Sequence, residues 1–242
     1  MLEQGTRFTG RILFLTEDLT LIERQIKGED IEWAPSLKLL ENISTDEITP
    51  GRVCFYYDET LGEYVYTGLR GGIIRKSDIK NAGFSVAVSG SGKGCGSSRE
   101  MAPYAELYSG ISLVIAPVFE KIYLQNCENI GLLTATDFGI IRRIQMGEEI
   151  EKEYFLEGRS SITRTIIDIG GLFNFNKARM KGDLEFGLPV SIRVRRPKTA
   201  TEKIILSRIT LKNVREFFTT GTTVFVRPDI RFSHDYTTAI TP

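Results

Sequence analysis

Hydrophobic and polar positions alternate along the chain in two kinds of segment. Short runs rich in β-branched and aromatic residues, bounded by glycine or polar residues, predict strands. These runs cover residues 9–16, 84–90 and 111–117. Longer segments that mix apolar and polar residues, most of them closed by glycine, predict helices. These segments cover residues 18–28, 103–110, 118–131 and 136–150. Strands that alternate with helices at this spacing predict an α/β fold with parallel strand pairs.

The pattern changes toward the C-terminus. Residues 160–171 return to the β-branched character of a strand, and residues 172–183 complete the unit. We therefore expect the first domain to end near Leu188. A basic cluster follows, then a helix capped by Thr199 or Thr201, and finally a strand and a polar loop. Because no further element completes it, this last segment is expected to be a short, incomplete α/β unit.

Composition places the chain among ordinary globular proteins. With 242 residues and 41% hydrophobic content, it can bury a substantial core. The 31 basic and 31 acidic side chains cancel, so no net field attracts nucleic acid or an anionic membrane, and any anion site must be local. No apolar run approaches the roughly 20 residues that span a bilayer, and the N-terminus lacks the layout of a secretory signal. A cytoplasmic location is therefore expected.

Cysteine and histidine are too few for a metal centre of the usual kind. Cys54, Cys95 and Cys127 are odd in number, far apart and without a CxxC pair. This spacing argues against a disulfide framework and against a self-contained zinc or iron-sulfur site. The single histidine, His234, does not change that expectation.

The stretch "SGSGKGCGSSREMAP" (residues 89–103) is a glycine-rich loop. It does not match a P-loop, because Lys93 is followed by glycine, and its glycine spacing does not match GxGxxG. One interpretation is a plain strand-to-helix connection in which Ser97 and Glu100 form a capping box. A helix capped at Ser97 would place Pro103 beyond its first turn, where the missing N–H costs a backbone hydrogen bond. We therefore expect the helix to begin nearer Glu100.

A helix that begins there leaves Ser97, Ser98 and Arg99 on the loop. Glycines let the backbone approach a ligand closely, N–H groups at a helix start attract anions, and an arginine can bind a carboxylate through two hydrogen bonds. The same positive environment would activate a serine as a base or a nucleophile. The loop is therefore a candidate carboxylate-binding site.

The residues of this loop and its surroundings resemble a known family. "GKGCGSSREMAPYAEL", followed by "VIAPVFEKIYLQNCENIGLL", is similar to the mobile swivel domain of the aconitase and isopropylmalate dehydratase superfamily. Upstream, "NISTDEITP" (residues 42–50) resembles the second swivel signature, a Thr-Asp dipeptide in a loop. A third and weaker match is "GLRGG" (residues 68–72), which resembles the family's Arg-Gly segment.

The resemblance implies a fold and a domain order. The fold would be a swivel-type β/β/α domain with a mixed, partly parallel sheet. Residues 1–188 would be the swivel, small-subunit-like domain, and residues 189–242 the N-terminal start of the catalytic, large-subunit-like portion. The segments "TATEKIILSR" and "VRPDIRFSHDYTTA" resemble that start. This order implies a fused protein that continues past Pro242.

The resemblance also assigns roles to residues. Ser97 would be the alkoxide base, with Asp46 beside it to orient the catalytic groups, although Asp46 could equally form an Asx turn. His234 and Asp235 fall on the pair that opens the catalytic portion, with a surface location as the alternative.

Ser98, Arg99 and Arg70 would bind substrate carboxylates, and Arg70 could equally be a surface turn arginine. Met101 stands where the family commonly has histidine, which leaves the substrate open.

The family's [4Fe-4S] cluster is held by three cysteines, one isolated and two in a CxxC. None of the cysteines here has that context, so the cluster is expected from the missing catalytic portion or from a partner subunit. The resemblance implies an iron-sulfur hydro-lyase that dehydrates or isomerises a hydroxy di- or tricarboxylic acid.

Three alternatives remain open at this point. One is a separate small subunit that requires a large-subunit partner. Another is a non-catalytic regulator that binds RNA, against which the zero net charge counts. The third is a self-sufficient serine enzyme that uses Ser97 in acyl transfer, which the absence of a GxSxG motif disfavours.

Overall fold

The computed structural model describes residues 5–184, 197–209 and 224–230 of the chain. The chain divides into two compact units, Met1–Asp183 and Leu184–Pro242. That residues 189–242 form the start of a catalytic portion stays a prediction.

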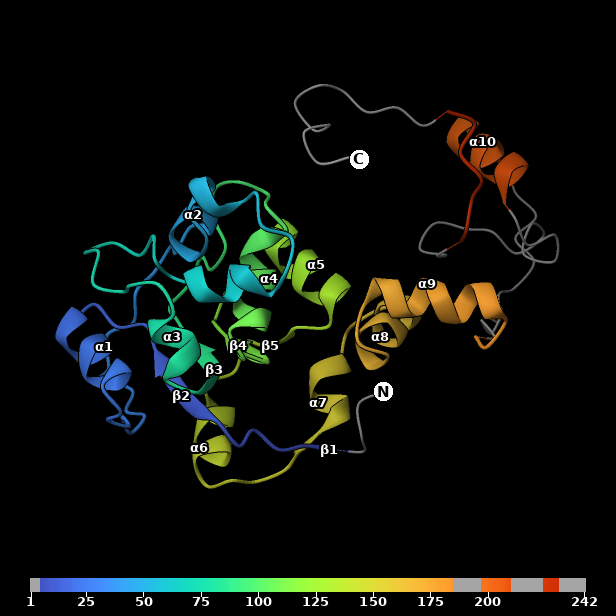
Figure 1. Ribbon diagram of the computed structural model, residues 1–242. Coiled ribbons are helices and arrows are strands. Elements are labelled where there is room, and N and C mark those ends of the chain that lie inside the picture. Colours follow the sequence, from blue (N-terminus) through green and yellow to red (C-terminus); the bar gives the residue numbers. More distant parts are fainter. Residues whose placement is uncertain (1–4, 185–196, 210–223, 231–242) are drawn as a thin grey trace. The chain divides into compact units, whose positions relative to one another are not determined.

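A four-stranded parallel sheet forms the centre of the first unit (Figure 1). Its strands, in spatial order, are β2 (Arg11–Phe14), β3 (Phe84–Val88), β4 (Leu113–Ile115) and β5 (Leu133–Ala135). A separate antiparallel pair joins β1 (Gly5–Thr6) to β6 (Ile150–Glu151). The predicted α/β class with a mixed, partly parallel sheet is confirmed.

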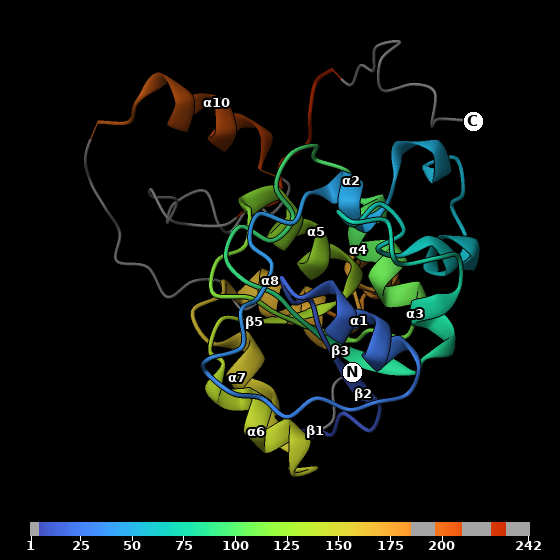
Figure 2. The same cartoon turned by 90° about the vertical axis from the view of Figure 1, so that its left-hand side faces the viewer.

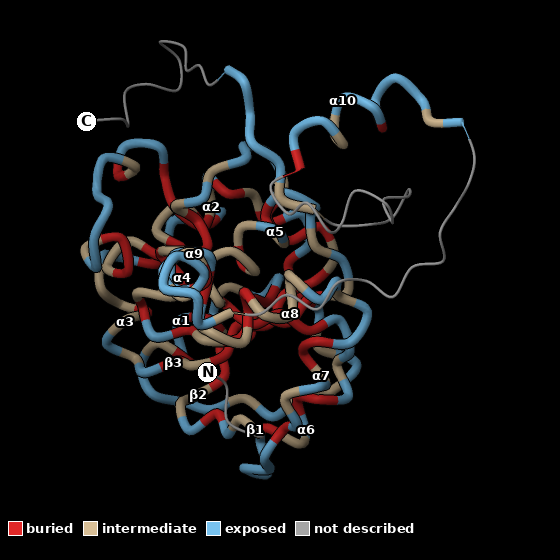
Figure 3. Tube along the Cα trace, turned by 90° about the vertical axis from the view of Figure 1, so that its right-hand side faces the viewer, coloured by how far each residue is buried: buried red, intermediate tan, exposed pale blue. Residues whose placement is uncertain are grey.

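Both faces of the parallel sheet are covered, which is why its strands are apolar on both sides. Leu13, Ala87 and Val114 face one core, which includes residues of α1 (Leu19–Ile26), α4 (Met101–Tyr108) and α5 (Lys121–Ile130). Their neighbours Phe14 and Val86 face a second core with α6 (Gly139–Gln145) and α7 (Lys152–Leu156). Figures 1 and 2 show α4 and α5 on one side of the sheet and α6 and α7 on the other, and in Figure 3 the buried residues gather between these layers.

Further elements lie between β2 and β3 and after β6. The first group comprises α2 (Thr45–Ile48), the 3-10 helices η1 (Gly51–Val53) and η2 (Glu59–Tyr64), and α3 (Asp78–Asn81). The second group comprises α8 (Ser161–Asp168) and α9 (Leu172–Lys181).

Most of the predicted elements are present. The three predicted strands contain β2, β3 and β4, and the predicted helices contain α1, α5 and α6. The sequence pattern missed β5, a buried run of three residues that begins two positions after Gly131, the C-cap of α5. The helix predicted over residues 136–150 is shorter than expected, because Gly147 in a left-handed conformation follows α6 and the segment then enters β6.

The strand predicted over residues 160–171 is wrong, because this segment forms α8. The hydroxyl of Ser160 accepts a hydrogen bond from the N–H of Thr163 and so caps the helix. Ile166 and Ile167 are buried on one side of α8. Its β-branched residues suggested a strand, but capping and one-sided burial outweigh that propensity.

The described part of the second unit is built on α10 (Ala200–Arg208). Thr199 and Glu202 form a capping box at its start, which confirms Thr199 as the cap, whereas Thr201 lies inside the helix. Ile209 is buried and makes an isolated antiparallel bridge with Val226. No helix in the described part of the chain is long and apolar enough to cross a membrane.

Candidate functional site

Two segments that lie far apart in the sequence run side by side at the carboxyl edge of the parallel sheet. The N–H of Gly94 donates to the carbonyl of Ile43 at 2.8 Å, and the N–H of Thr45 donates to the carbonyl of Cys95 at 2.9 Å. The hydroxyl of Thr45 donates to the carbonyl of Ser97 at 2.8 Å. These bonds join the Thr-Asp segment to the glycine loop, so the two motifs identified in the sequence form one site. Ligands of open α/β sheets bind at this edge.

The helix α2 places two carboxylates in this site. Ser44 and Glu47 form a capping box, in which each side chain bonds the other's backbone N–H. This box fixes the turn that carries Asp46 and Glu47 next to one another. Each carboxylate then pairs with a different arginine, Asp46 with Arg99 and Glu47 with Arg70.

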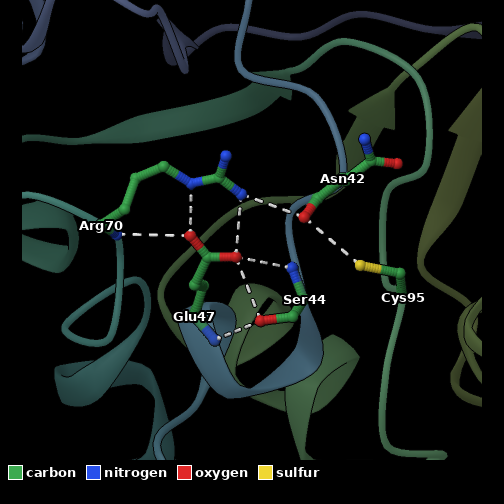
Figure 4. Close-up of polar contacts among 5 residues, drawn as sticks. All are labelled: Asn42, Ser44, Glu47, Arg70 and Cys95. Atoms are coloured by element: carbon green, nitrogen blue, oxygen red, sulfur yellow. Dashed lines mark hydrogen bonds and ion pairs between the residues drawn. The ribbon is translucent and has the colours of Figure 1, made fainter.

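The ion pair of Glu47 and Arg70 is bidentate (Figure 4). Arg70 Nε donates to Glu47 Oε1 at 2.6 Å, and Arg70 Nη2 donates to Glu47 Oε2 at 3.1 Å and to the carbonyl of Asn42 at 3.0 Å. Partial burial acts to raise the pKa of Glu47, but the hydrogen bonds from Arg70 and Ser44 outweigh it and lower the pKa to about 2. Glu47 is therefore ionised at neutral pH.

The turn that carries Arg70 lies directly against α2. A Cβ atom placed on Gly68 would lie 2.2 Å from the carbonyl oxygen of Asp46, so the turn has no room for a side chain there. The first glycine of "GLRGG" is thus explained by close packing, and that packing brings Arg70 to Glu47.

Arg99 pairs with Asp46, the residue before Glu47 on α2. A Cβ atom placed on Gly51, at the start of η1, would be 3.4 Å from Arg99 Nη2. The side chain of Arg99 is 30% exposed and that of Asp46 is 58% exposed. Solvent therefore reaches this ion pair, and a ligand carboxylate could also reach Arg99.

Ser97 and Ser98 are exposed on the loop that precedes α4. The helix begins at Met101 with Glu100 as its N-cap, and no side chain caps it. This confirms the predicted start and excludes the capping box of Ser97 and Glu100. Among the described residues, neither serine hydroxyl has a hydrogen-bond partner, and the N–H groups of Gly96, Ser97 and Ser98 donate to no acceptor. The loop thus presents polar groups available to a ligand.

The cysteines of this chain do not fit an iron-sulfur cluster. Cys127 is completely buried in the core, and the thiol of Cys95 donates to the carbonyl of Asn42 at 3.3 Å. Burial raises the pKa of both thiols, which disfavours the thiolate that a metal needs. No group of three His, Cys, Asp or Glu side chains able to hold a metal ion occurs in the described ranges.

The structure brings together Asp46, Arg70, Ser97, Ser98 and Arg99 as neighbours around α2 and the glycine loop. His234 and Asp235 lie outside the described residues. Their roles stay predictions.

Sequence analysis missed the partners that hold these residues. Glu47 was visible as the fourth residue of a Ser-x-x-Glu capping pattern that starts at Ser44. Thr45 gave no signal of its contact with the glycine loop. Lys93 was dismissed with the P-loop pattern, yet its side chain is fully buried.

The fold and the site define a class of protein: an α/β domain that presents an exposed serine and two carboxylate-paired arginines at one edge of a parallel sheet. The family model of the aconitase C-terminal domain matches residues 65–136.

Two curated relatives match most of their own length. The chain is 32% identical to the isopropylmalate/citramalate isomerase small subunit of Methanocaldococcus jannaschii, over 59% of this chain and 92% of the relative. It is 33% identical to the 3-isopropylmalate dehydratase small subunit of Caldanaerobacter subterraneus, over 60% of this chain and 98% of the relative. A crystal structure of the 3-isopropylmalate dehydratase from Methanocaldococcus jannaschii matches with a TM-score of 0.45 and 28% identity, over 59% of this chain and 91% of that chain.

The chain belongs to the aconitase and 3-isopropylmalate dehydratase superfamily of hydro-lyases, and its matched part corresponds to the small subunit.

Proposed function

We propose that this chain is the swivel, substrate-binding part of an iron-sulfur hydro-lyase that dehydrates or isomerises a hydroxy di- or tricarboxylic acid. A large subunit or catalytic portion would carry the [4Fe-4S] cluster, because the cysteines described here do not fit one. Residues 189–242 would be the start of that catalytic portion, with His234 and Asp235 in it.

The convergence of the two motif loops carries this proposal. Residues 42–48 and 93–99 are joined by five hydrogen bonds, and the turn of Arg70 packs against α2. This arrangement gathers cationic groups, unengaged N–H groups and a serine hydroxyl on one exposed surface. A dicarboxylate with a weakly acidic C–H bond requires such a combination of groups.

Ser97 would act as the base. Its oxygen would take the proton from the carbon next to a substrate carboxylate, and the C–H electron pair would form the double bond as the hydroxyl leaves the neighbouring carbon as hydroxide. When bound, the cluster of the catalytic portion would supply the Lewis acidity for that departure. Such a base must be an alkoxide, which requires a strong positive environment. The N–H groups of Gly96 and Ser98, together with Arg99, are donors of the right kind.

The arginines would hold the substrate carboxylates. Arg70 uses Nε and Nη2 on Glu47 and Asn42, so a carboxylate would bind through Nη1 or exchange with Glu47. Ser98 would add its hydroxyl. The carboxylates of Asp46 and Glu47 would then keep both arginines in place while the site is empty.

Replacing the base tests the proposal. In the enzyme assembled with its cluster-bearing partner, Ser97→Ala is expected to lower kcat by about 10²-fold or more, because it removes the proton acceptor. Hydratase activity with a panel of hydroxy di- and tricarboxylates is the measurement. Ser91→Ala, in the same loop, is the control and should keep kcat near that of the unmodified chain. Full activity of Ser97→Ala would contradict the role of Ser97.

A further inference from the structure

A lysine in the middle of the glycine loop points into the core. The side chains of Lys93 and Glu106 are both 0% exposed, and Lys93 Nζ lies 3.0 Å from Glu106 Oε1. Lys93 Nζ also donates to the hydroxyl of Tyr66 at 2.9 Å and lies 4.5 Å from the centre of that ring. The hydroxyls of Tyr66 and Tyr123 donate to the two oxygens of Glu106. These four residues are called the Lys93 cluster.

Every side-chain nitrogen and oxygen atom of the cluster has a partner within the cluster. Glu106 accepts from both tyrosines and pairs with the lysine, and Tyr66 both accepts and donates. Burial lowers the pKa of Lys93, and the carboxylate of Glu106 opposes that shift. A buried ion pair is weak evidence for stability, and its best-attested use is to specify one arrangement among several.

Three members of the cluster lie on different segments that lead to the site, and the fourth, Tyr123, lies on α5. Lys93 precedes Ser97 by four residues on the glycine loop, and Tyr66 precedes Arg70 by four residues on its turn. Glu106 belongs to α4, which begins two residues after Arg99.

Tyr66 has an unusual backbone conformation, which its contacts in the cluster help to stabilise. Its φ is 59°, in the left-handed region where a bulky residue is an outlier. Such a conformation persists where the surroundings over-determine it, and it commonly occurs at functional sites. The carbonyl of Tyr66 accepts from the N–H of Leu69 at 2.9 Å, so this strained residue opens the turn that delivers Arg70.

We propose that Lys93 and Glu106 are positioning residues that fix the glycine loop and the Arg70 turn relative to one another. What they position, the base Ser97 and the carboxylate-binding Arg70, rests on the proposed function. The fixed arrangement of the two loops does not depend on that function. The cluster touches no substrate and acts through the two backbones.

The test replaces the charges while keeping the shapes. Lys93→Met combined with Glu106→Gln leaves a neutral pair of similar volume, and the Gln amide still offers a partner to each tyrosine hydroxyl. In the full chain, hydrogen exchange of the backbone-bonded amides of Gly94 and Leu69 is expected to accelerate by about tenfold or more. Exchange in β4 should stay unchanged. Lys152→Met with Asp168→Asn, which removes an ion pair between α7 and α8, is the matched control and should leave both loops as they are.

Two results of the exchange experiment would overturn the inference. One is loop exchange in the double variant at the rate of the unmodified chain. The other is equal acceleration throughout the first unit, which would show a general loss of stability in place of local positioning.

A kinetic measurement separates the inference from the proposed function. In the assembled enzyme the double variant should lower kcat/KM by about 10- to 100-fold, since a small misplacement of reacting groups has effects of this size. If Ser97→Ala is inactive, unchanged kcat and KM of the double variant would also overturn the inference. If loop exchange accelerates while Ser97→Ala remains active, the proposed function fails, but the positioning of the loops stands.

Discussion

Glu47 determines what Arg70 can bind. Its carboxylate engages Nε and Nη2 of the guanidinium and, at the same time, closes the capping box with Ser44. One side chain therefore shapes α2 and orients an arginine. Under the proposed function, a substrate carboxylate that reaches Arg70 would meet a cation that is already oriented, so little ordering cost would remain for binding.

Glu47→Gln is expected to lower the free energy of unfolding by about 1–2 kcal/mol at pH 7, because charge-assisted hydrogen bonds to Arg70 are lost at a partly exposed site. The folded-state pKa of about 2 lies below the ordinary value of 4.5. The contribution of Glu47 is therefore fully present above about pH 4.5 and declines as the pH falls toward 2.

Denaturant unfolding of both chains between pH 2 and 7 measures this effect. The difference between them should shrink as the pH falls below about 4.5. Glu23→Gln, on the exposed side of α1, is the control and should show no such trend. A difference that is constant over the whole range would contradict the assigned pKa.

The glycine loop is shaped by the elements on which it packs. Gly94 has a φ of 83°, and a Cβ atom placed there would lie 2.1 Å from Cγ of Tyr123 on α5. The loop therefore packs against α5 and also makes backbone hydrogen bonds to the Thr-Asp segment. Close approach to its own fold, in addition to any ligand, explains the glycine at this position.

Gly94→Ala is expected to lower the free energy of unfolding by about 2–5 kcal/mol, the sum of a left-handed alanine and an overpacked ring. Gly147→Ala is the matched control, because Gly147 also has a positive φ, of 70°, but has open space around its Cβ position. Its cost should be about 1–2 kcal/mol. Equal costs at the two positions, measured by denaturant unfolding, would show that the contact with Tyr123 does not matter.

At the scale of the whole molecule, each unit has its own core. Both cores on the parallel sheet are formed by residues before Asp183, and the small cluster around Ile209 is formed by residues of the second unit. The sheet unit is large enough to bury a core of its own.

A chain that ends at Asp183 is therefore expected to keep the fold of the sheet unit. Its Tm, measured by circular dichroism, should lie within about 3 °C of the sheet transition in the full chain, which corresponds to less than about 1 kcal/mol at this size. A decrease of 10 °C or an unfolded fragment would show that the sheet unit depends on the rest of the chain.

The pattern of the sequence predicted much of this architecture, for reasons that are local. Buried parallel strands are continuous apolar runs, and several helices end near a glycine, so β2, β3, β4 and the helices α1, α4, α5 and α6 were visible. The segment of α8 was misassigned, because its β-branched residues favour a strand unless capping and burial oppose them. The strand β5 was missed because three residues give no periodicity.

The sequence by itself determined which loops are candidates for the proposed chemistry. The motifs "NISTDEITP" and "GSSRE" identified Asp46, Ser97 and Arg99 as candidates, because each motif is a short run of residues that can be read directly from the sequence. Only the tertiary structure decided how those loops meet. The pairing of Glu47 with Arg70 and of Lys93 with Glu106 joins residues distant in sequence, and no local pattern encodes such contacts. The physical reason is that burial and hydrogen bonding across segments depend on the packed fold, whereas propensity and motif spacing depend on neighbours along the chain.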